Sequence, residues 1–312
     1  MQDLHLPVLR KEVVYYLNLK KGDFVFDGTL GGAGHTIEII KAIAPTGKII
    51  AADLDSQALS TAARKLKSLD FLKYAYIAKD SYVNAAEILK RFGIKSVNGF
   101  LLDLGISSLQ IDLSVKGFSY LKNQKLDMRF SDEGKPDAFE VVNSYPEEKL
   151  REIFYRYGEE KWAAAIAKKI SDYRKTGPIK TTGQLVEIIK SSVPAKYRFS
   201  GHPAKRIFQA IRIEVNSELE NISRGLNAGL DVLVPGGRMA VISYHSLEDR
   251  IVKRTFEKFS GKCTCPPDLP VCICGETGRG RVITKKPVMP SEEELSENLR
   301  SKSARLRVFE KK

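Results

Sequence analysis

Apolar runs alternate with amphipathic stretches along the first hundred residues of the chain. Four runs rich in apolar residues predict strands, at 24–27, 48–53, 74–78 and 97–103. The stretches between them have the spacing of amphipathic helices, at 36–43, 56–69 and 83–92. Because strands that alternate with helices in this way form βαβ units, the pattern predicts a parallel sheet with helices on both faces.

The pattern changes beyond the fourth strand. Residues 105–145 are rich in Ser, Gly, Asp and Lys and predict a loop. Three helical stripes follow, at Leu150-Ile153-Phe154-Tyr157, Ala163-Ile166-Ala167-Ile170 and Leu185-Ile188-Ile189. Ser144 with Glu147, and Thr181 with Gln184, have the spacing of capping boxes at the first and the third of these helices. This middle part of the chain therefore predicts a compact helical domain without strands.

A strand signal returns at 236–245, after a long helical stretch. A chain seldom leaves a parallel sheet and begins a second one for a single strand, so we expect this strand to join the first sheet. The predicted fold is therefore α/β, with a discontinuous sheet domain at 1–108 and 205–312 and an inserted all-helical domain at 109–204. The polar, basic tail at 285–312 is expected to fold back across the sheet or the substrate.

The distribution of charged residues points to a binding partner. The chain has 312 residues and a formal net charge of +13. Residues 151–212 hold 14 Lys/Arg against 5 Asp/Glu, and the last thirteen residues hold six basic side chains against Glu310. Clustered basic residues favour a phosphate backbone, because their binding releases condensed counterions. A soluble protein that is basic for other reasons is an equal alternative at this point.

Two kinds of apolar segment are missing from the sequence. No run reaches the roughly 18 uncharged apolar residues of a membrane span, and the N-terminal residues contain no apolar signal core. We therefore expect a cytoplasmic protein that does not contact a membrane.

A glycine-rich segment, residues 27–35, stands between the first strand and the first helix. Glycines let a backbone approach a ligand closely, and Asp53 at the end of the next strand suits ribose hydroxyls. The third glycine of the dinucleotide fingerprint is missing, since Ile37 stands in its place. Asp27 would repel a pyrophosphate but suits the cationic S-adenosylmethionine. The segment therefore favours a methyl donor over a dinucleotide; glycines that serve only a tight turn are the structural alternative.

Asp103 is a third acid at the end of a predicted strand. In open parallel sheets the ligand lies beyond the carboxyl ends of the strands. We therefore expect Asp27, Asp53 and Asp103 to face one crevice. A single acid at a strand end is usually a loop cap, but three at strand ends are harder to explain in that way.

Long polar motifs make the chain resemble a known family. They include DGTLGGAGHT (27–36), DLGISSLQID (103–112), YGEEKWA (157–163), HPAKRIFQAIRIEVNSEL (202–219) and PGGRMAVISYHSLEDRIVK (235–253). The chain resembles the bacterial small-subunit ribosomal RNA methyltransferases of the MraW type, which make N4-methylcytidine. The resemblance implies a Rossmann-like class I methyltransferase sheet with an inserted helical domain. It also implies S-adenosylmethionine-dependent methylation of the exocyclic N4 amine of a cytidine in 16S rRNA, within the small ribosomal subunit.

The resemblance also implies a set of cofactor contacts. Together with Gly32 of the glycine-rich segment, these residues are Ala33, Gly34, His35, Asp53, Tyr82, Asp103 and Gln110. Tyr82 would place an aromatic face beside the adenine. The chain departs from the family pattern at Leu109 in place of proline, Lys116 in place of Arg, Phe130-Ser131 in place of Met-Asp and Asn298-Leu299-Arg300 in place of Asn-Pro-Arg.

The reacting amine is a poor nucleophile because its lone pair is delocalised into the ring. An enzyme must align it with the methyl group and accept its hydrogen bonds as charge develops. Asp103 is the preferred catalytic residue, although the usual prolines after the fourth strand are absent. His245 is a second catalytic candidate, with a purely structural histidine as its alternative.

Basic and aromatic residues supply candidate RNA contacts. Tyr244, Phe118 and Tyr120 could stack on an extruded base, with a packing role in the core as the equal alternative. Phosphate contacts are predicted for Arg129, Lys205, Arg206 and Arg212, with solvent-facing or ion-paired roles as alternatives. We expect the helical domain to form the principal RNA-binding surface.

All four cysteines stand in two C-x-C pairs, Cys263 with Cys265 and Cys272 with Cys274. Four thiolates suit tetrahedral zinc, although structural zinc sites more often use C-x2-C pairs. Disulfides are disfavoured in the cytoplasm. A structural zinc site and thiols that bind no metal are both kept as interpretations.

Other functions fit fewer of these features. An NAD-dependent oxidoreductase would need the missing glycine, and a non-catalytic RNA-binding module would not need the acidic crevice. Methylation of another nucleic acid or another atom is a third alternative, because a fold does not fix its substrate. The sequence leaves the oligomeric state open, a homodimer included.

Overall fold

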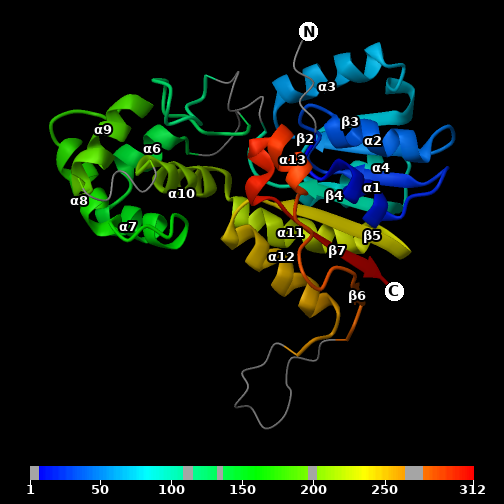
Figure 1. The fold of residues 1–312 in the computed structure, drawn as a ribbon. Helices are drawn as coiled ribbons and strands as arrows, with labels where there is room; N and C mark the ends of the chain where they lie inside the picture. Colours follow the sequence, from blue (N-terminus) through cyan, green and yellow to red (C-terminus); the bar gives the residue numbers. More distant parts are fainter. Residues whose placement is uncertain (1–6, 108–114, 132–135, 196–201, 264–276) are drawn as a thin grey trace. The chain divides into compact units, whose positions relative to one another are not determined.

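The computed structural model describes residues 7–107, 115–131, 136–195, 202–263 and 277–312. The chain divides into two compact units. The sheet unit comprises Met1–Ser107 and Leu219–Lys312, and the helical unit comprises Ser108–Glu218 (Figure 1). The predicted α/β fold with an inserted helical domain is confirmed.

Seven strands form one sheet in the order β3-β2-β1-β4-β5-β7-β6. The strands are β1 (Phe24–Asp27), β2 (Lys48–Asp53), β3 (Ala75–Lys79), β4 (Val97–Asp103), β5 (Leu233–Ser243), β6 (Gly280–Val282) and β7 (Arg305–Lys311). The first five strands are parallel, while β7 is antiparallel to both β5 and β6. After β3 the chain crosses to the other side of β1 and enters β4, so the strand order reverses beside β1.

Helices cover both faces of the sheet (Figure 1). The helices of the sheet unit are α1 (Arg10–Leu17), α2 (Gly34–Ile43), α3 (Ser56–Ser68), α4 (Ala85–Arg91), α11 (Glu218–Val232), α12 (Ser246–Phe259) and α13 (Glu292–Glu297). Short 3-10 turns are η1 (Leu72–Tyr74), η2 (Tyr82–Asn84) and η4 (Leu299–Ser303). Apolar residues of α1, α2 and α3 form one core, and those of α4, α11 and α12 form the other.

Alternation along the strands explains why the apolar runs are continuous. In β1, Val25 joins the core under α2 and Phe26 joins the core under α4; in β2, Ile49 and Ile50 divide in the same way. All four side chains are fully buried. A strand with helices on both faces needs apolar residues at successive positions, which is the pattern that the sequence shows.

The helical unit is built from helices around its own core. They are α6 (Ala138–Ser144), α7 (Glu147–Arg156), α8 (Ala163–Tyr173), α9 (Thr182–Ser192) and α10 (Ala204–Asn216). The capping box of Thr181 and Gln184 is confirmed at α9. The one predicted for Ser144 and Glu147 is wrong, because Ser144 is the last residue of α6 and Pro146 is the N-cap of α7.

The far border of the helical unit differs from the expected one. The sequence pattern placed it after residue 204, whereas in the structure it follows Glu218. The reason is that α10 packs against α6, α7 and α9 and contributes Ile207 and Ile211 to the core of the helical unit. The amphipathic pattern of α10 is equally compatible with either core, so the sequence alone does not choose between them.

The basic tail contains a strand, β7, that the sequence pattern did not predict. β7 lies between β5 and β6 and buries Leu306, Val308 and Phe309. Between these apolar residues stands Arg307, which is itself buried and forms an ion pair with Asp249 of α12 at 2.6 Å. The tail therefore completes the sheet instead of lying across it.

Candidate functional site

Three aspartates stand at the carboxyl ends of three neighbouring strands. Asp27 ends β1, Asp53 ends β2 and Asp103 ends β4. Because β1 pairs with both β2 and β4, these ends share one edge of the sheet. This edge lies where the strand order reverses, the place at which open α/β sheets bind ligands. We call Asp27, Asp53 and Asp103 the carboxylate cluster.

Asp27 is the most buried member of the cluster, with 1% of its surface exposed. One carboxylate oxygen accepts a hydrogen bond from the Thr36 hydroxyl at 2.6 Å, and the other accepts from the backbone N–H of Thr29 at 3.1 Å. Burial nevertheless raises the pKa of Asp27 to about 6, and the nearby charge of Asp53 adds to the rise. A cation at this edge of the sheet would therefore stabilise the ionised form of Asp27.

Asp53 orders the glycine-rich segment. Its carboxylate accepts hydrogen bonds from the backbone N–H groups of Gly31 at 2.8 Å and Asp55 at 2.9 Å. Gly31 and Ala33 both have positive φ, at 47° and 61°, and Ala33 is the N-cap of α2. Burial raises the pKa of Asp53. The carboxylate thus holds the turn, and each oxygen keeps a lone pair for a further donor.

Asp103 touches side chains from two other elements. Its Oδ1 accepts a hydrogen bond from the Tyr244 hydroxyl at 2.8 Å, while its Oδ2 lies 3.6 Å from Nε2 of His35. Its backbone N–H donates to the Thr29 hydroxyl at 2.7 Å. The pKa of Asp103 is raised to about 7, mainly by burial and also by the charges of Asp27 and Glu248, while the Tyr244 hydrogen bond opposes the rise.

His35 is a neutral group in this cluster. Its side chain is 7% exposed, and neither ring nitrogen forms a hydrogen bond with any part of the chain that the structure describes. Burial lowers the pKa of His35 to about 4, so the ring is uncharged at neutral pH. Buried ring nitrogens without partners are uncommon, and they mark this place as one where a ligand can supply the missing hydrogen bonds.

The other predicted cofactor residues have different surroundings in the structure. Gly34 begins α2 against Pro7, and a side chain there would come within 3.0 Å of the proline ring. Tyr82 is half-buried on η2, and Gly225 makes room for its ring, since a Cβ at that glycine would lie 2.3 Å from Tyr82 Cδ2. Gly32 accepts a hydrogen bond from Lys65 at 3.4 Å. Gln110 lies outside the described residues.

His245 has a structural role, the alternative that the sequence left open. It is the N-cap of α12, and its Nδ1 accepts a hydrogen bond from the backbone N–H of Glu248. The Glu248 carboxylate in turn accepts from the backbone N–H groups of His245 at 3.2 Å and Tyr244 at 2.7 Å. This reciprocal pair is a capping box with histidine in place of Ser or Thr.

Tyr244 makes a contact that the sequence does not predict. Its hydroxyl is hydrogen-bonded to Asp103, and burial raises its pKa well above the usual value. Stacking of its ring on an RNA base stays a prediction. Sequence reasoning missed this contact because the two residues are 141 positions apart. One signal was available: both stand at or near the ends of strands that are predicted to lie in one sheet.

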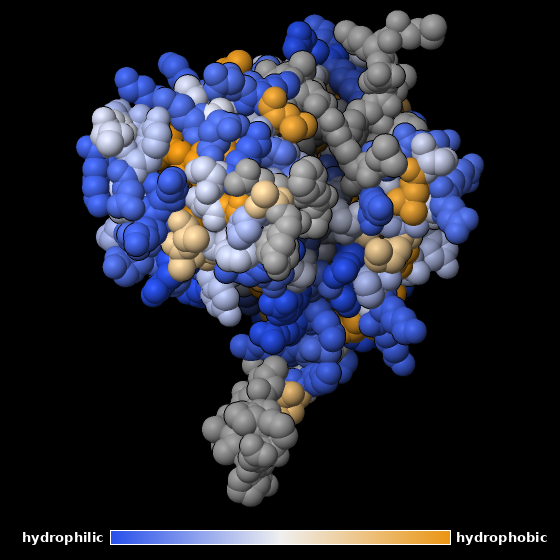
Figure 2. Space-filling model, turned by 60° about the vertical axis from the view of Figure 1, so that its left-hand side comes forward, coloured by the Kyte–Doolittle hydropathy of each residue, from blue (hydrophilic) through white to orange (hydrophobic). Residues whose placement is uncertain are grey.

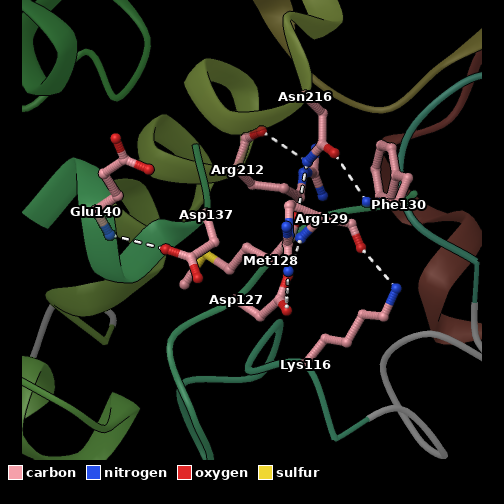
Figure 3. Close-up of polar contacts among 9 residues, drawn as sticks. All are labelled: Lys116, Asp127, Met128, Arg129, Phe130, Asp137, Glu140, Arg212 and Asn216. Carbon is pink, nitrogen blue, oxygen red and sulfur yellow. Dashed lines mark hydrogen bonds and ion pairs between the residues drawn. The ribbon is translucent and has the colours of Figure 1, made fainter. Parts of the chain in front are cut away.

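Arg129 is held firmly within the helical unit (Figure 3). Its guanidinium forms two hydrogen bonds with the Asp127 carboxylate, both at 2.9 Å, and its side chain is 23% exposed. The preceding Met128 is buried with a φ of 59°. Asn216 fixes this bend, since its amide donates to Met128 O at 2.8 Å and accepts from Phe130 N at 2.9 Å.

The remaining predicted RNA contacts divide into two kinds. Arg212 forms a bidentate ion pair with the buried Glu218, at 2.8 and 3.0 Å, which is the ion-paired alternative. Lys205 and Arg206 are exposed near the start of α10, where Arg206 donates to Glu159 O at 3.1 Å.

The face shown in Figure 2 is mostly hydrophilic, with hydrophobic residues in small separate patches. Such a surface suits a polar partner better than an apolar one.

The predicted zinc site cannot be placed. Cys263 is exposed, and Cys265, Cys272 and Cys274 lie outside the described residues. Within the described ranges there is no group of three or more His, Cys, Asp or Glu side chains suited to hold a metal. The zinc site stays a prediction without support.

No helix in the described ranges is long and apolar enough to cross a membrane.

Comparison with known proteins gives a consistent result over the whole chain. The sequence model of the MraW methylase family matches residues 2–312. A protein named ribosomal RNA small subunit methyltransferase H, from Clostridium botulinum, is 46% identical over 311 residues, covering 100% of both chains. A protein of the same name from Halothermothrix orenii is 47% identical and covers 98% of both chains. A match of this length and identity shows the family, and the chain belongs to the MraW methylase family.

Proposed function

We propose that the protein transfers a methyl group from S-adenosylmethionine to the exocyclic N4 amine of a cytidine in 16S ribosomal RNA. The observation that carries this proposal is the carboxylate cluster, which lies at the switch point of the sheet in a chain that belongs to the MraW methylase family. The printed names of the relatives support small-subunit ribosomal RNA as the substrate. An RNA of the ribosome as substrate also favours the cytoplasm as the place of action.

The residues at the sheet edge fit the methyl donor. Asp27 and Asp103 offer carboxylates whose pKa values are raised by burial to about 6 and about 7, so a cation at this edge is favoured. The unpartnered ring nitrogens of His35 can take up hydrogen bonds. Asp53 has lone pairs left for ribose hydroxyls. The residues that would hold the donor are Ala33, Gly34, His35, Asp53, Tyr82, Asp103 and Gln110.

S-adenosylmethionine supplies an activated methyl group on a sulfonium. The chain supplies the rest of the chemistry by orienting the amine and accepting its proton. A buried carboxylate is suited to both tasks, because it accepts a hydrogen bond from the amine and stabilises the positive charge that develops there. A dinucleotide is disfavoured here, since its pyrophosphate would face three carboxylates.

The helical unit is the proposed RNA-binding part. Its basic stretch, residues 151–212, carries the exposed Lys205 and Arg206, which suit phosphates. Arg129 is held in a fixed orientation by Asp127, so it is preorganised for a directional contact. Arg212 is omitted from this surface because of its ion pair with Glu218.

The test measures cofactor binding and methylation separately. We expect calorimetry to show binding of S-adenosylmethionine and no binding of NAD, and we expect Asp53→Ala to lose the methyl donor. The matched control is Asp231→Ala, at an exposed aspartate of the sheet unit. Purified small ribosomal subunits lacking the modification should then accept labelled methyl groups at N4 of one cytidine. NAD binding, or methylation at another atom, would overturn the proposal.

A further inference from the structure

Strand pairing brings Tyr244 to Asp103. Asp103, the last residue of β4, is paired with Ile242 near the end of β5, and Leu104 N donates to Ile242 O at 2.9 Å. The Tyr244 ring packs against Gly105, whose φ is 94° and whose Cβ, if present, would lie 3.3 Å from the ring. The two side chains therefore meet because of the register between β4 and β5.

Hydrogen bonds hold Tyr244 at both its backbone and its hydroxyl group. Its backbone N–H donates to the Glu248 carboxylate at 2.7 Å, the same carboxylate that closes the capping box of α12. Its hydroxyl donates to Oδ1 of Asp103 at 2.8 Å. A phenol held at both ends in this way loses little further rotamer freedom when it positions the carboxylate.

The groups that face Asp103 come from four elements. Asp27 comes from β1, His35 from α2, Tyr244 from the end of β5, and Glu248 from α12. Two of these groups are acidic and His35 is neutral, so Tyr244 is the one whose hydrogen bond favours the ionised Asp103. In the part of the chain that the structure describes, no Lys or Arg side chain forms an ion pair with Asp103, and Nε2 of the neutral His35 lies 3.6 Å from its Oδ2.

We propose that Asp103 accepts the proton of the cytosine amine and that Tyr244 is the positioning residue that holds its carboxylate for this task. This inference rests on the proposed function. In the step, the amine lone pair forms the new N–C bond while the S–C bond breaks, and its electron pair stays on sulfur. The proton lost from nitrogen passes to Asp103, which leaves N4-methylcytidine, S-adenosylhomocysteine and one proton.

The first test is the pH dependence of Tyr244→Phe. Without the hydroxyl, the pKa of Asp103 rises, because the hydrogen bond from Tyr244 lowers it. The acid limb of the single-turnover rate should then move to higher pH, and a rise of one in that pKa makes the rate on the limb about tenfold lower. The rate at high pH should recover toward wild type. Tyr15→Phe, at an exposed tyrosine of α1, is the matched control.

A second readout needs neither cofactor nor RNA. Carbon NMR of labelled aspartate carboxyls, with Asp103→Asn to assign the signal, gives the pKa of Asp103 in the free protein. We expect Tyr244→Phe to raise that pKa and Tyr15→Phe to leave it unchanged. An unchanged pKa, or equal loss of rate at every pH, would overturn the positioning role of Tyr244.

The third measurement separates Asp103 as a base from Asp103 as a cofactor ligand. Asp103→Asn should lower the single-turnover rate at saturating S-adenosylmethionine by about 10²–10⁴-fold. A wild-type rate at saturation, with only weaker cofactor binding, would overturn the proton-acceptor role. Failure of the proposed function would be visible independently, since the wild-type protein would then not methylate the small subunit at N4 at any pH.

Discussion

At the scale of single residues, the main feature of the site is a group of buried carboxylates for which the described residues supply no Lys or Arg ion-pair partner. Asp27 and Asp103 have pKa values raised to about 6 and about 7, mainly by burial. Ionising both near His35, which is uncharged, places two like charges in a poorly solvated region. A cationic ligand relieves this cost, so binding and protonation are coupled.

The coupling predicts how cofactor affinity depends on pH. A bound cation lowers both carboxyl pKa values, so binding releases protons at pH values near and below those of the free groups. Affinity for S-adenosylmethionine should therefore rise with pH between about 5 and 7 and level off above that range. Calorimetry in buffers of different ionisation enthalpy measures the released protons. A release that persists undiminished in Asp27→Asn and Asp103→Asn would contradict this origin.

His245 offers a second prediction at residue scale. If its ring serves as the helix cap, His245→Ala should cost about 1 kcal/mol of folding stability, through the lost acceptor at α12. His245→Ser, which keeps a capping oxygen, should restore most of that loss in urea unfolding. Both variants should retain a single-turnover rate close to wild type. A large loss of rate in the stable serine variant would instead support the catalytic role considered from sequence.

At the scale of elements, the segment before α6 is held by one buried side chain. Asn216, near the end of α10, spans Met128 and Phe130 and also donates to Arg212 O at 2.9 Å (Figure 3). The backbone at Met128 has a φ of 59°, a region that suits glycine better than methionine. A bend of this kind persists only where the surrounding hydrogen bonds determine it.

Loss of the Asn216 side chain should lower the stability of the protein. Asn216→Ala takes their side-chain partner from the partly buried N–H of Phe130 and the buried carbonyl of Met128, and we expect a loss of about 2 kcal/mol in free energy of unfolding. Asn227→Ala is the matched control, because this exposed asparagine donates within its own helix, to Ser223 O, and makes no other side-chain hydrogen bond among the described residues. Urea unfolding with tryptophan fluorescence measures both variants. Equal losses in the two would show that the bend does not depend on Asn216.

Elements also show which features could be predicted from the sequence. Strands buried on both faces were predictable, since β1, β2 and β4 are runs rich in apolar residues. β7 was not, because Arg305 and Arg307 alternate with Leu306 and Val308 and give the tail a basic composition. Its alternation of period two is visible in retrospect, but only the tertiary ion pair of Arg307 with Asp249 makes a buried arginine acceptable.

The candidate site, too, could be predicted from the sequence only in part. Asp27, Asp53 and Asp103 could be placed together because a parallel sheet aligns its carboxyl ends. The Tyr244–Asp103 contact depends on the register between β4 and β5, which separation along the chain hides. The capping role of His245 was hidden for another reason, since histidine is not among the usual N-cap residues.

At the scale of the whole molecule, the two compact units suggest a division of tasks that charge reversal can test. Lys205→Glu with Arg206→Glu should weaken binding of small-subunit RNA and reduce the slope of log K against log salt, by about 1.4 for two phosphate contacts on single strands. Cofactor affinity should stay unchanged, because the carboxylate cluster belongs entirely to the sheet unit. Lys67→Glu with Lys90→Glu reverses two exposed lysines of the sheet unit and lowers the net charge equally. If this control pair weakens RNA binding as much as the first, the effect comes from overall charge, and the helical unit is not the specific RNA-binding surface.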